Sequence, residues 1–219
     1  MVKSGERAHK RVYRLGVDLD GVLGDPVVPT LKRLQQQGKG RDLERRDITE
    51  WYTEIDDTNI SAEIENNLRD PAFVEAVPVI PSSQAVMQQL WKEFHVIIVT
   101  NRPQETEAST RQWLRTHFST KRRSSRGHPC FHQYVGTRKR GKLQVDLDFL
   151  IDDHLKTVKK FALKRGTALL FSQPWNEKLD DEEIAQLLRE GQIIRCRNWP
   201  EARETLKEIT NMDEEVRSS

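Results

Sequence analysis

Six short apolar stretches alternate along the chain with segments whose apolar residues recur at helical spacing. The apolar stretches are Val12–Asp18, Phe94–Thr100, Phe131–Gly136, Leu147–Asp152, Thr167–Phe171 and Ile193–Cys196. Helices are expected around Ser83–Lys92, Glu105–Phe118, Leu155–Lys164, Glu182–Arg189 and Glu201–Ile209. Because strands that alternate with helices form parallel sheets covered on both faces, the pattern predicts an α/β protein with a Rossmann-like, doubly wound parallel sheet.

The segment 29–72 breaks this alternation. It is polar and rich in charge, and it favours short helices around Leu31–Gln37, Thr49–Ile55 and Ala62–Leu68. We interpret it as a small helical cap inserted after the first strand, so that residues 1–28 and 73–219 form the core. At the end of the chain, residues 212–219 are expected to fray.

The composition is that of a protein with one hydrophobic core. The 219 residues are 36% hydrophobic, enough for a core with a small appended subdomain. A formal net charge of +2 gives no general case for a nucleic-acid-binding or membrane-surface protein. Cys130 and Cys196 form no CxxC pair, which argues against a disulfide framework or a zinc site of four thiolates and favours a cytoplasmic protein. No apolar stretch reaches the roughly 20 residues that cross a bilayer, so no membrane partner is expected.

Positive charge is concentrated between residues 111 and 142, which include ten Lys or Arg residues and no Asp or Glu. The densest parts are residues 121–126 and 138–140. Blocks of like charge usually form solvated loops. The alternative is a patch near the active site that steers polyanionic substrates such as nucleic acid.

Polar side chains follow four of the predicted strands at their carboxyl ends. They are Asp18 and Asp20 after the first strand, Thr100, Asn101 and Arg102 after the second, Lys142 shortly after the third, and Asp152 and Asp153 after the fourth. Ligands of open α/β sheets bind in the crevice beyond these ends. We therefore expect the side chains to share one site.

Such a site would suit phosphoryl transfer. Up to four carboxylates would share the crevice, and their oxygens suit Mg²⁺, which often also binds a phosphate oxygen. A carboxylate can attack a phosphoryl group and form an aspartyl-phosphate while a second carboxyl moves the proton. A hydroxyl and an ammonium, here those of Thr100 and Lys142, would stabilise the charge on the phosphoryl group.

The order of these residues resembles the four motifs of the haloacid dehalogenase superfamily of phosphatases. The matching segments are Asp18–Leu23, Thr100–Pro103, Lys142 and Phe149–Asp153, and they span most of the chain. Within that superfamily the sequence is most similar to the 5'(3')-deoxyribonucleotidase group and its bacterial and phage relatives. The narrower resemblance lies in Asp47–Trp51, Asp70–Phe73 and Gln173–Asn176.

The resemblance implies a role for each matched carboxylate. Asp18 would be the nucleophile and a magnesium ligand. Asp20 would be the general acid and base, and its backbone carbonyl would also bind the metal. One of Asp152 and Asp153 would complete the metal shell, and because the sequence does not say which, both are candidates.

The resemblance also implies how the substrate is held. Thr100 and Lys142 would clamp the phosphate, the amide of Asn101 would bind it, and Arg102 lies close enough in sequence to assist. The cap would close over the site and touch the leaving group.

Trp51, Tyr52 and Phe73 are the candidate contacts to a nucleobase, although Trp51 and Tyr52 would equally suit packing between cap and core. Gly24–Pro26 and Pro81-Ser82 depart from the family pattern. The resemblance therefore does not determine the hinge geometry of the cap or the exact substrate.

These features together predict a phosphoric monoester hydrolase with Mg²⁺ as cofactor and a nucleoside or deoxynucleoside monophosphate as the small phosphorylated substrate. Two alternatives remain. One is a phosphatase of nucleic-acid ends, for which the basic segment would be the binding surface. The other is a catalytically silent nucleic-acid-binding module, since a fold alone does not guarantee activity. The sequence determines neither the 5' or 3' preference nor the oligomeric state.

Overall fold

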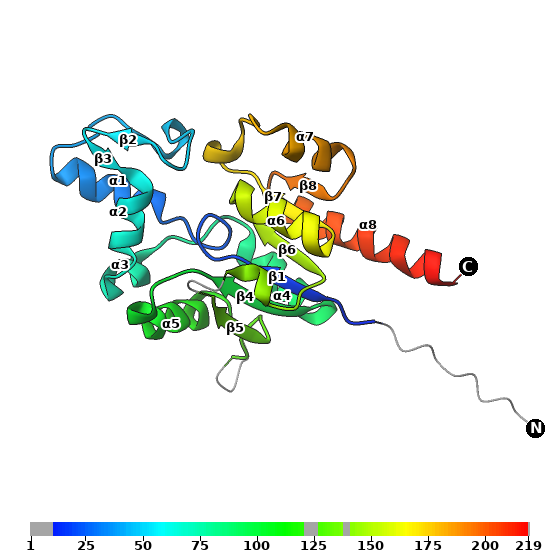
Figure 1. Cartoon of the computed structure of the whole chain (residues 1–219). Helices are drawn as coiled ribbons and strands as arrows, with labels where there is room; N and C mark the ends of the chain where they lie inside the picture. The colour runs from blue at the N-terminus through cyan, green and yellow to red at the C-terminus, as the bar shows by residue number, and fades with distance from the viewer. Residues whose placement is uncertain (1–10, 121–126, 138–140, 219) are drawn as a thin grey trace, which may run out of the picture.

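The computed structural model describes residues 11–120, 127–137 and 141–218. A six-stranded sheet lies at its centre, with the strand order β5-β4-β1-β6-β7-β8 and every neighbouring pair parallel (Figure 1). The strands are β1 (Arg14–Val17), β4 (His95–Thr100), β5 (Gln133–Gly136), β6 (Phe149–Asp152), β7 (Ala168–Phe171) and β8 (Ile193–Cys196). All six predicted strands are confirmed.

Helices cover both faces of this sheet. They are α4 (Ser83–Glu93), α5 (Glu107–His117) and α8 (Trp199–Ser218) on one face, and α6 (Leu155–Arg165) and α7 (Glu182–Arg189) on the other. In β4, Val96 and Ile98 belong to the hydrophobic cluster of the first face, whereas Ile97 and Val99 belong to that of the second. Successive residues of a strand point to opposite faces, so a strand buried on both sides is apolar throughout. The predicted α/β, doubly wound fold is confirmed.

The central position of β1 determines which strand ends meet. Val17 of β1 is paired with Ile98 of β4 on one side and with Ile151 of β6 on the other. The next residue continues this pairing, because the Asp18 N–H donates to the Ile151 carbonyl at 3.0 Å. The residues that follow these three strands therefore lie side by side at the carboxyl edge of the sheet.

Six short elements lie between β1 and α4 along the chain. They are α1 (Val27–Gln36), the 3-10 helix η1 (Arg45–Asp47), strands β2 (Glu54–Ile55) and β3 (Thr58–Asn59), α2 (Ile60–Asn67) and α3 (Pro71–Ala76). Figure 1 shows most of them, in blue and cyan, set apart from the sheet beyond its carboxyl edge. The segment between β1 and α4, called the insertion below, therefore consists mainly of short helices.

Its details differ from the prediction in two places. The helix expected at Thr49–Ile55 is wrong, because this segment forms a turn that leads into a two-stranded hairpin of β2 and β3. Asp56 and Asp57 at the tip have φ angles of 45° and 59°, which Asp tolerates better than most residues. Helix α3 was not predicted, although its start is well marked: Pro71 is its first residue and the Asp70 side chain accepts from the Ala72 N–H at 2.9 Å.

The expectation of a frayed end is wrong for residues 212–218, which continue α8. In the part of the chain that the structure describes, no helix is both long and apolar enough to cross a membrane.

Candidate active site

A buried lysine joins two of the predicted site residues. Lys142 opens the 3-10 helix η4 (Lys142–Gln144), and its Nζ lies 2.5 Å from Asp18 Oδ2 and 2.7 Å from Asp152 Oδ2. All three side chains are buried. Burial alone would lower the pKa of Lys142, but the Asp152 and Asp18 carboxylates outweigh it and raise this pKa, so the side chain is charged.

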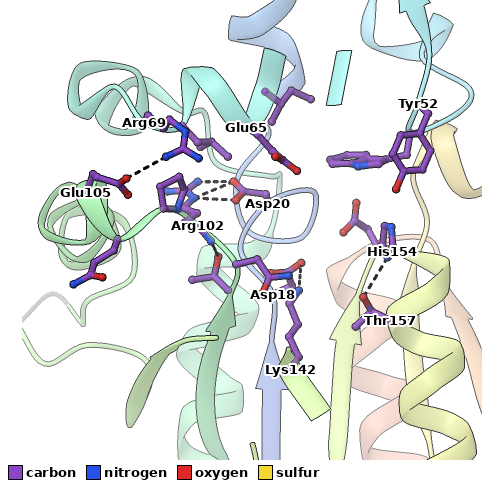
Figure 2. A pocket seen from close by; sticks show the side chains of 18 residues that line it. Asp18, Asp20, Tyr52, Glu65, Arg69, Arg102, Glu105, Lys142, His154 and Thr157 are labelled. Atoms are coloured by element: carbon purple, nitrogen blue, oxygen red, sulfur yellow. Dashed lines mark hydrogen bonds and ion pairs between the residues drawn. The ribbon is translucent and has the colours of Figure 1, made fainter. Parts of the chain in front are cut away.

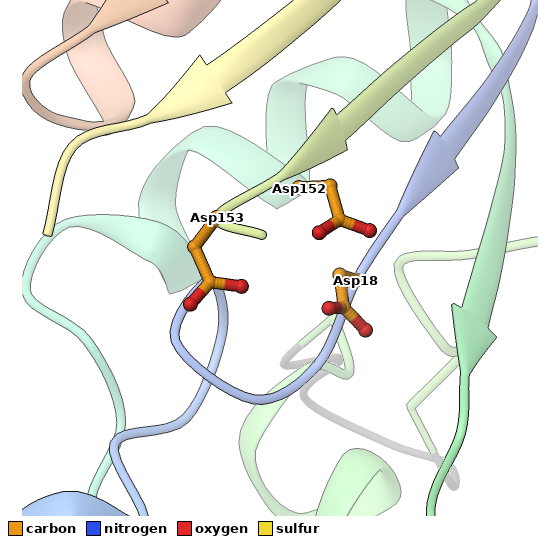
Figure 3. Close-up of side chains that lie close together, drawn as sticks. All are labelled: Asp18, Asp152 and Asp153. Atoms are coloured by element: carbon orange, nitrogen blue, oxygen red, sulfur yellow. The ribbon is translucent and has the colours of Figure 1, made fainter. Parts of the chain in front are cut away.

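Three carboxylates, two of which contact this lysine, lie close together (Figure 3). Oxygen atoms of Asp18, Asp152 and Asp153 all lie within 4.8 Å of one another. Burial raises the pKa of Asp18 to about 7 against the opposing effect of Lys142. It also raises the pKa of Asp153 well above its ordinary value, and the charge of Asp152 adds to this. One ammonium does not balance three buried carboxylates, and the oxygen donors fit a hard divalent cation.

The loop after β7 holds Asp153 in place. Trp175, in the 3-10 helix η5 (Pro174–Asn176), donates from Nε1 to Asp153 Oδ2 at 2.7 Å, and Asn176 Nδ2 donates to the Asp153 carbonyl at 2.8 Å. On the opposite side, a Cβ at Gly21 would lie 2.2 Å from Asp153 Oδ2, and Gly21 has a φ of +76°. Glycine is therefore required at position 21 for two independent reasons.

This loop also contacts the insertion. Arg45 of η1 donates to the Gln173 side chain, and its guanidinium lies 5.3 Å from the centre of the Trp175 ring. The Gln173 amide in turn donates to the Gly21 carbonyl. A single chain of contacts thus leads from the insertion to the residues that surround Asp153.

Asp20 lines the same cavity but lies outside the carboxylate cluster. Its carboxylate is bound by Arg102, whose Nε donates to both oxygens at 3.1 and 2.9 Å and whose Nη2 donates to Oδ1 at 2.6 Å. The Arg102 side chain is 0% exposed, and its guanidinium lies 5.6 Å from the centre of the Trp113 ring. The sequence suggested that Arg102 assists with phosphate, whereas the structure pairs it with Asp20.

Thr100 and Asn101 lie at the carboxyl end of β4, and both line the cavity. Thr100 is buried, and its Oγ1 accepts from the Arg102 N–H at 3.2 Å. The Asn101 side chain accepts a hydrogen bond from the Thr137 hydroxyl, which holds its amide at the edge of the sheet. Both residues are therefore where the sequence placed them.

The cavity has a volume of about 990 Å³ and lies between the sheet edge and the insertion (Figure 2). From the insertion it is lined by Trp51, Tyr52, Ile64, Glu65, Leu68 and Arg69. The Trp51 ring packs edge-on against His154 at a centroid distance of 6.4 Å and lies 5.7 Å from Trp175. Tyr52 is 61% exposed. This volume is in the range of small-molecule sites.

Phe73 is not among the residues that line the cavity. Its side chain is 2% exposed, belongs to the hydrophobic core, and lies under the guanidinium of Arg33 at 4.7 Å. The segment Asp70–Phe73 forms the start of α3, and the Phe73 side chain packs into the core and not toward the cavity.

Sequence reasoning missed Glu65, Arg69 and His154, which also line the cavity. The predicted helix in residues 62–68 contains Glu65, but its periodicity alone does not say which polar face points to a ligand. Burial lowers the pKa of His154, so its ring is neutral near neutral pH. The basic segments 121–126 and 138–140 lie outside the described residues.

Solved structures of haloacid dehalogenases and related hydrolases share this fold. A haloacid dehalogenase (HAD) hydrolase from Bacillus subtilis, YfnB, bound to magnesium, has a TM-score of 0.54 at 16% identity and covers 92% of this chain and 100% of its own. A HAD family hydrolase from Deinococcus radiodurans R1, with bound phosphate and sodium, has the same TM-score and identity and covers 91% and 96%. The chain therefore has the fold of these haloacid dehalogenase-like hydrolases.

The sequence narrows this class further. The model of the family "5' nucleotidase, deoxy (Pyrimidine), cytosolic type C protein" matches residues 11–199. A 5'(3')-deoxyribonucleotidase from Clostridium acetobutylicum is 24% identical over 199 residues, which cover 89% of this chain and 97% of the relative. The chain belongs to this 5' nucleotidase family, and the protein is a phosphoric monoester hydrolase. The resemblance seen in the sequence is thereby confirmed.

Proposed function

We propose that the protein is a Mg²⁺-dependent nucleotidase that hydrolyses nucleoside or deoxynucleoside monophosphates through an aspartyl-phosphate on Asp18. The observation that carries this proposal is the contact of Asp18 with Lys142 beside Asp152 and Asp153. The Asp18 carboxylate faces the Lys142 ammonium, which can bind the phosphoryl oxygens of a substrate. A phosphate bound there would lie beside Asp18, in position for nucleophilic attack on phosphorus.

The chemistry divides into two steps. In the first, an Asp18 oxygen attacks phosphorus, the bond from phosphorus to the leaving oxygen breaks, and that oxygen takes a proton from Asp20. In the second, water attacks phosphorus, Asp20 takes a proton from the water, and the bond between Asp18 and phosphorus breaks. Asp20 is then ready for the next cycle, since it has given and regained one proton.

Asp18 with one or both of Asp152 and Asp153 would hold Mg²⁺, and by the family resemblance the backbone carbonyl of Asp20 would join them. When bound, the ion neutralises charge on the phosphoryl oxygens. The crowding of buried carboxylates around a single lysine supports this assignment.

Four further residues have roles in this proposal. Lys142, Thr100 and the amide of Asn101 bind the phosphoryl oxygens from the sheet edge and stabilise the charge of the transition state. Arg102 is given a different role from the one its sequence position suggested. Because it contacts both oxygens of Asp20, it fixes the orientation of the carboxylate that handles the proton.

The substrate assignment rests on the insertion. We propose that residues 29–72 form a cap that shields the reaction from bulk water and contacts the leaving group. Trp51 and Tyr52 line the cavity and offer aromatic faces for a nucleobase. A mononucleotide fits a cavity of about 990 Å³. The 5'(3')-deoxyribonucleotidase from Clostridium acetobutylicum, similar over most of its length, supports this choice.

Phosphate release from a panel of substrates tests the proposal. The panel comprises ribo- and deoxyribonucleoside 5'- and 3'-monophosphates, sugar phosphates and end-phosphorylated oligonucleotides, each with Mg²⁺ and with chelator. The highest kcat/KM is expected for a mononucleotide, with no turnover in chelator. A higher value for an oligonucleotide would instead support action on nucleic-acid ends.

A further inference from the structure

Glu65 places a carboxylate in the cavity that the proposed chemistry does not use. It lies on α2, is exposed, and lines the cavity from the side of the insertion. Figure 2 shows its side chain extending from α2 toward Asp20. Within the described part of the chain, no hydrogen bond or ion pair engages this carboxylate. It is therefore a free negative charge that faces the leaving-group side of the site.

The cations around the cavity do not offset this charge. Each cationic side chain that lines it, among the residues that the structure describes, already contacts a carboxylate. The pairs are Lys142 with Asp18 and Asp152, Arg102 with Asp20, and Arg69 with Glu105. The outer cavity, above the phosphate site, is consequently acidic.

We infer that Glu65 is a specificity-determining residue that excludes leaving groups carrying a second phosphate. This inference rests on the proposed function and deepens it. A nucleoside leaving group is uncharged and can donate N–H or O–H groups to the carboxylate. A leaving group with a further phosphate, as in a nucleoside bisphosphate or a polynucleotide end, meets electrostatic repulsion there.

The size of the effect follows from Coulomb's law. Two unit charges about 8 Å apart in a partly solvated site repel each other enough to change affinity by roughly two- to thirtyfold. We expect the removal of the Glu65 charge to favour a bisphosphate over a monophosphate by about fivefold or more. Salt screens such repulsion, so the discrimination of the wild-type protein should weaken as ionic strength rises.

The test compares kcat/KM for thymidine 5'-monophosphate and thymidine 3',5'-bisphosphate in the wild-type protein, Glu65→Gln and Glu63→Gln. Glu63 is the matched control because it lies on the same helix but does not line the cavity. Two residues along a helix correspond to a rotation of about 200°, so the two carboxylates point to opposite sides. Both variants change the net charge equally.

The expected result is a higher ratio of bisphosphate to monophosphate turnover in Glu65→Gln and an unchanged ratio in Glu63→Gln. A ratio unaffected by Glu65→Gln, or raised equally by both variants, overturns this inference and leaves the nucleotidase proposal standing. If the wild-type protein releases phosphate from no mononucleotide of the panel described above, the proposed function itself fails, and the inference fails with it.

Discussion

Arg102 binds Asp20 through three contacts, with Nε 3.1 and 2.9 Å from its two oxygens and Nη2 2.6 Å from Oδ1. The pair bridges the ends of β1 and β4, and the guanidinium is fully buried. A guanidinium held in this way fixes the orientation of Asp20, the proton donor of the proposed reaction, with the groups that it would otherwise use to bind a phosphate. If Arg102 orients Asp20, its loss should mainly slow substrates whose leaving group needs a proton. If Arg102 binds phosphate, its loss should slow all substrates alike.

We therefore predict that Arg102→Gln slows substrates with poor leaving groups most. The first phosphoryl transfer from a nucleoside monophosphate should fall by about a hundredfold, because misplaced general acid–base catalysis costs 10²-fold or more. For p-nitrophenyl phosphate, whose leaving group needs no proton, it should fall by less than about tenfold. Single-turnover rates measure both effects, and Arg102→Lys should restore part of the loss. Equal losses for the two substrates, with weaker inhibition by inorganic phosphate, would show that Arg102 binds phosphate instead.

Asp18→Asn should abolish turnover while the protein stays folded. The amide has the size of the carboxylate but cannot form the phospho-enzyme, so a loss beyond about a thousandfold is expected. Steady-state rates and acid-quench trapping of phospho-enzyme measure it. Asp180→Asn, an exposed position before α7, serves as the control. More than about a hundredth of wild-type activity in Asp18→Asn would be incompatible with an essential nucleophile at this position.

Thermal stabilisation by Mg²⁺ should increase with pH. Burial raises the pKa of Asp18 from 3.8 to about 7, so the free protein binds a proton there that the unfolded chain releases. The resulting contribution to stability is complete below the ordinary pKa and is lost as the pH rises through about 7. In the proposed site Mg²⁺ would bind the ionised carboxylates, so it would compete with protons at low pH and replace them at high pH.

Melting temperatures with Mg²⁺ and with chelator, from about pH 5.5 to about pH 8, test this linkage. The difference between the two conditions should grow across this range. The double variant Asp152→Asn, Asp153→Asn should show little difference at any pH and should need far more Mg²⁺ for activity. A shift of equal size at all pH values would contradict the proposed ligands.

Trp175→Phe should raise the Mg²⁺ concentration required for half-maximal activity by about tenfold, because residues that orient metal ligands typically affect affinity by this much. The substitution keeps an aromatic ring in the core but removes the hydrogen bond to Asp153. Trp91→Phe is a matched control, since Trp91 Nε1 has no hydrogen-bond partner. If both variants have the same Mg²⁺ requirement, Trp175 has only a packing role.

The sheet could be predicted from the sequence because its strands are buried on both faces. Val96–Val99 of β4 alternate between two hydrophobic clusters, which makes all four of these positions apolar. The carboxyl-end residues followed from that prediction, since parallel strands end at the same edge. The pattern thus predicts that Asp18, Thr100, Lys142 and Asp153 meet at one site, and all four line the cavity.

The contacts between side chains were less predictable. Nothing in the local sequence distinguishes an Arg102 that binds phosphate from one that binds Asp20, because their separation of 82 positions is closed only by the fold. Phe73 was misjudged for a related reason. An aromatic residue near a site suits either a ligand or the core, and its neighbours in space decide between them.

Gly21 leaves room for Asp153, since a Cβ on the glycine would lie 2.2 Å from the Asp153 carboxylate, far inside van der Waals contact. The two positions are therefore expected to vary together during evolution. A relative with a side chain at position 21 should hold the counterpart of Asp153 differently, and with it the proposed metal site. In an alignment of the family, the loss of this glycine should thus coincide with a rebuilt metal site, which makes position 21 a simple marker of which relatives share the geometry described for this protein.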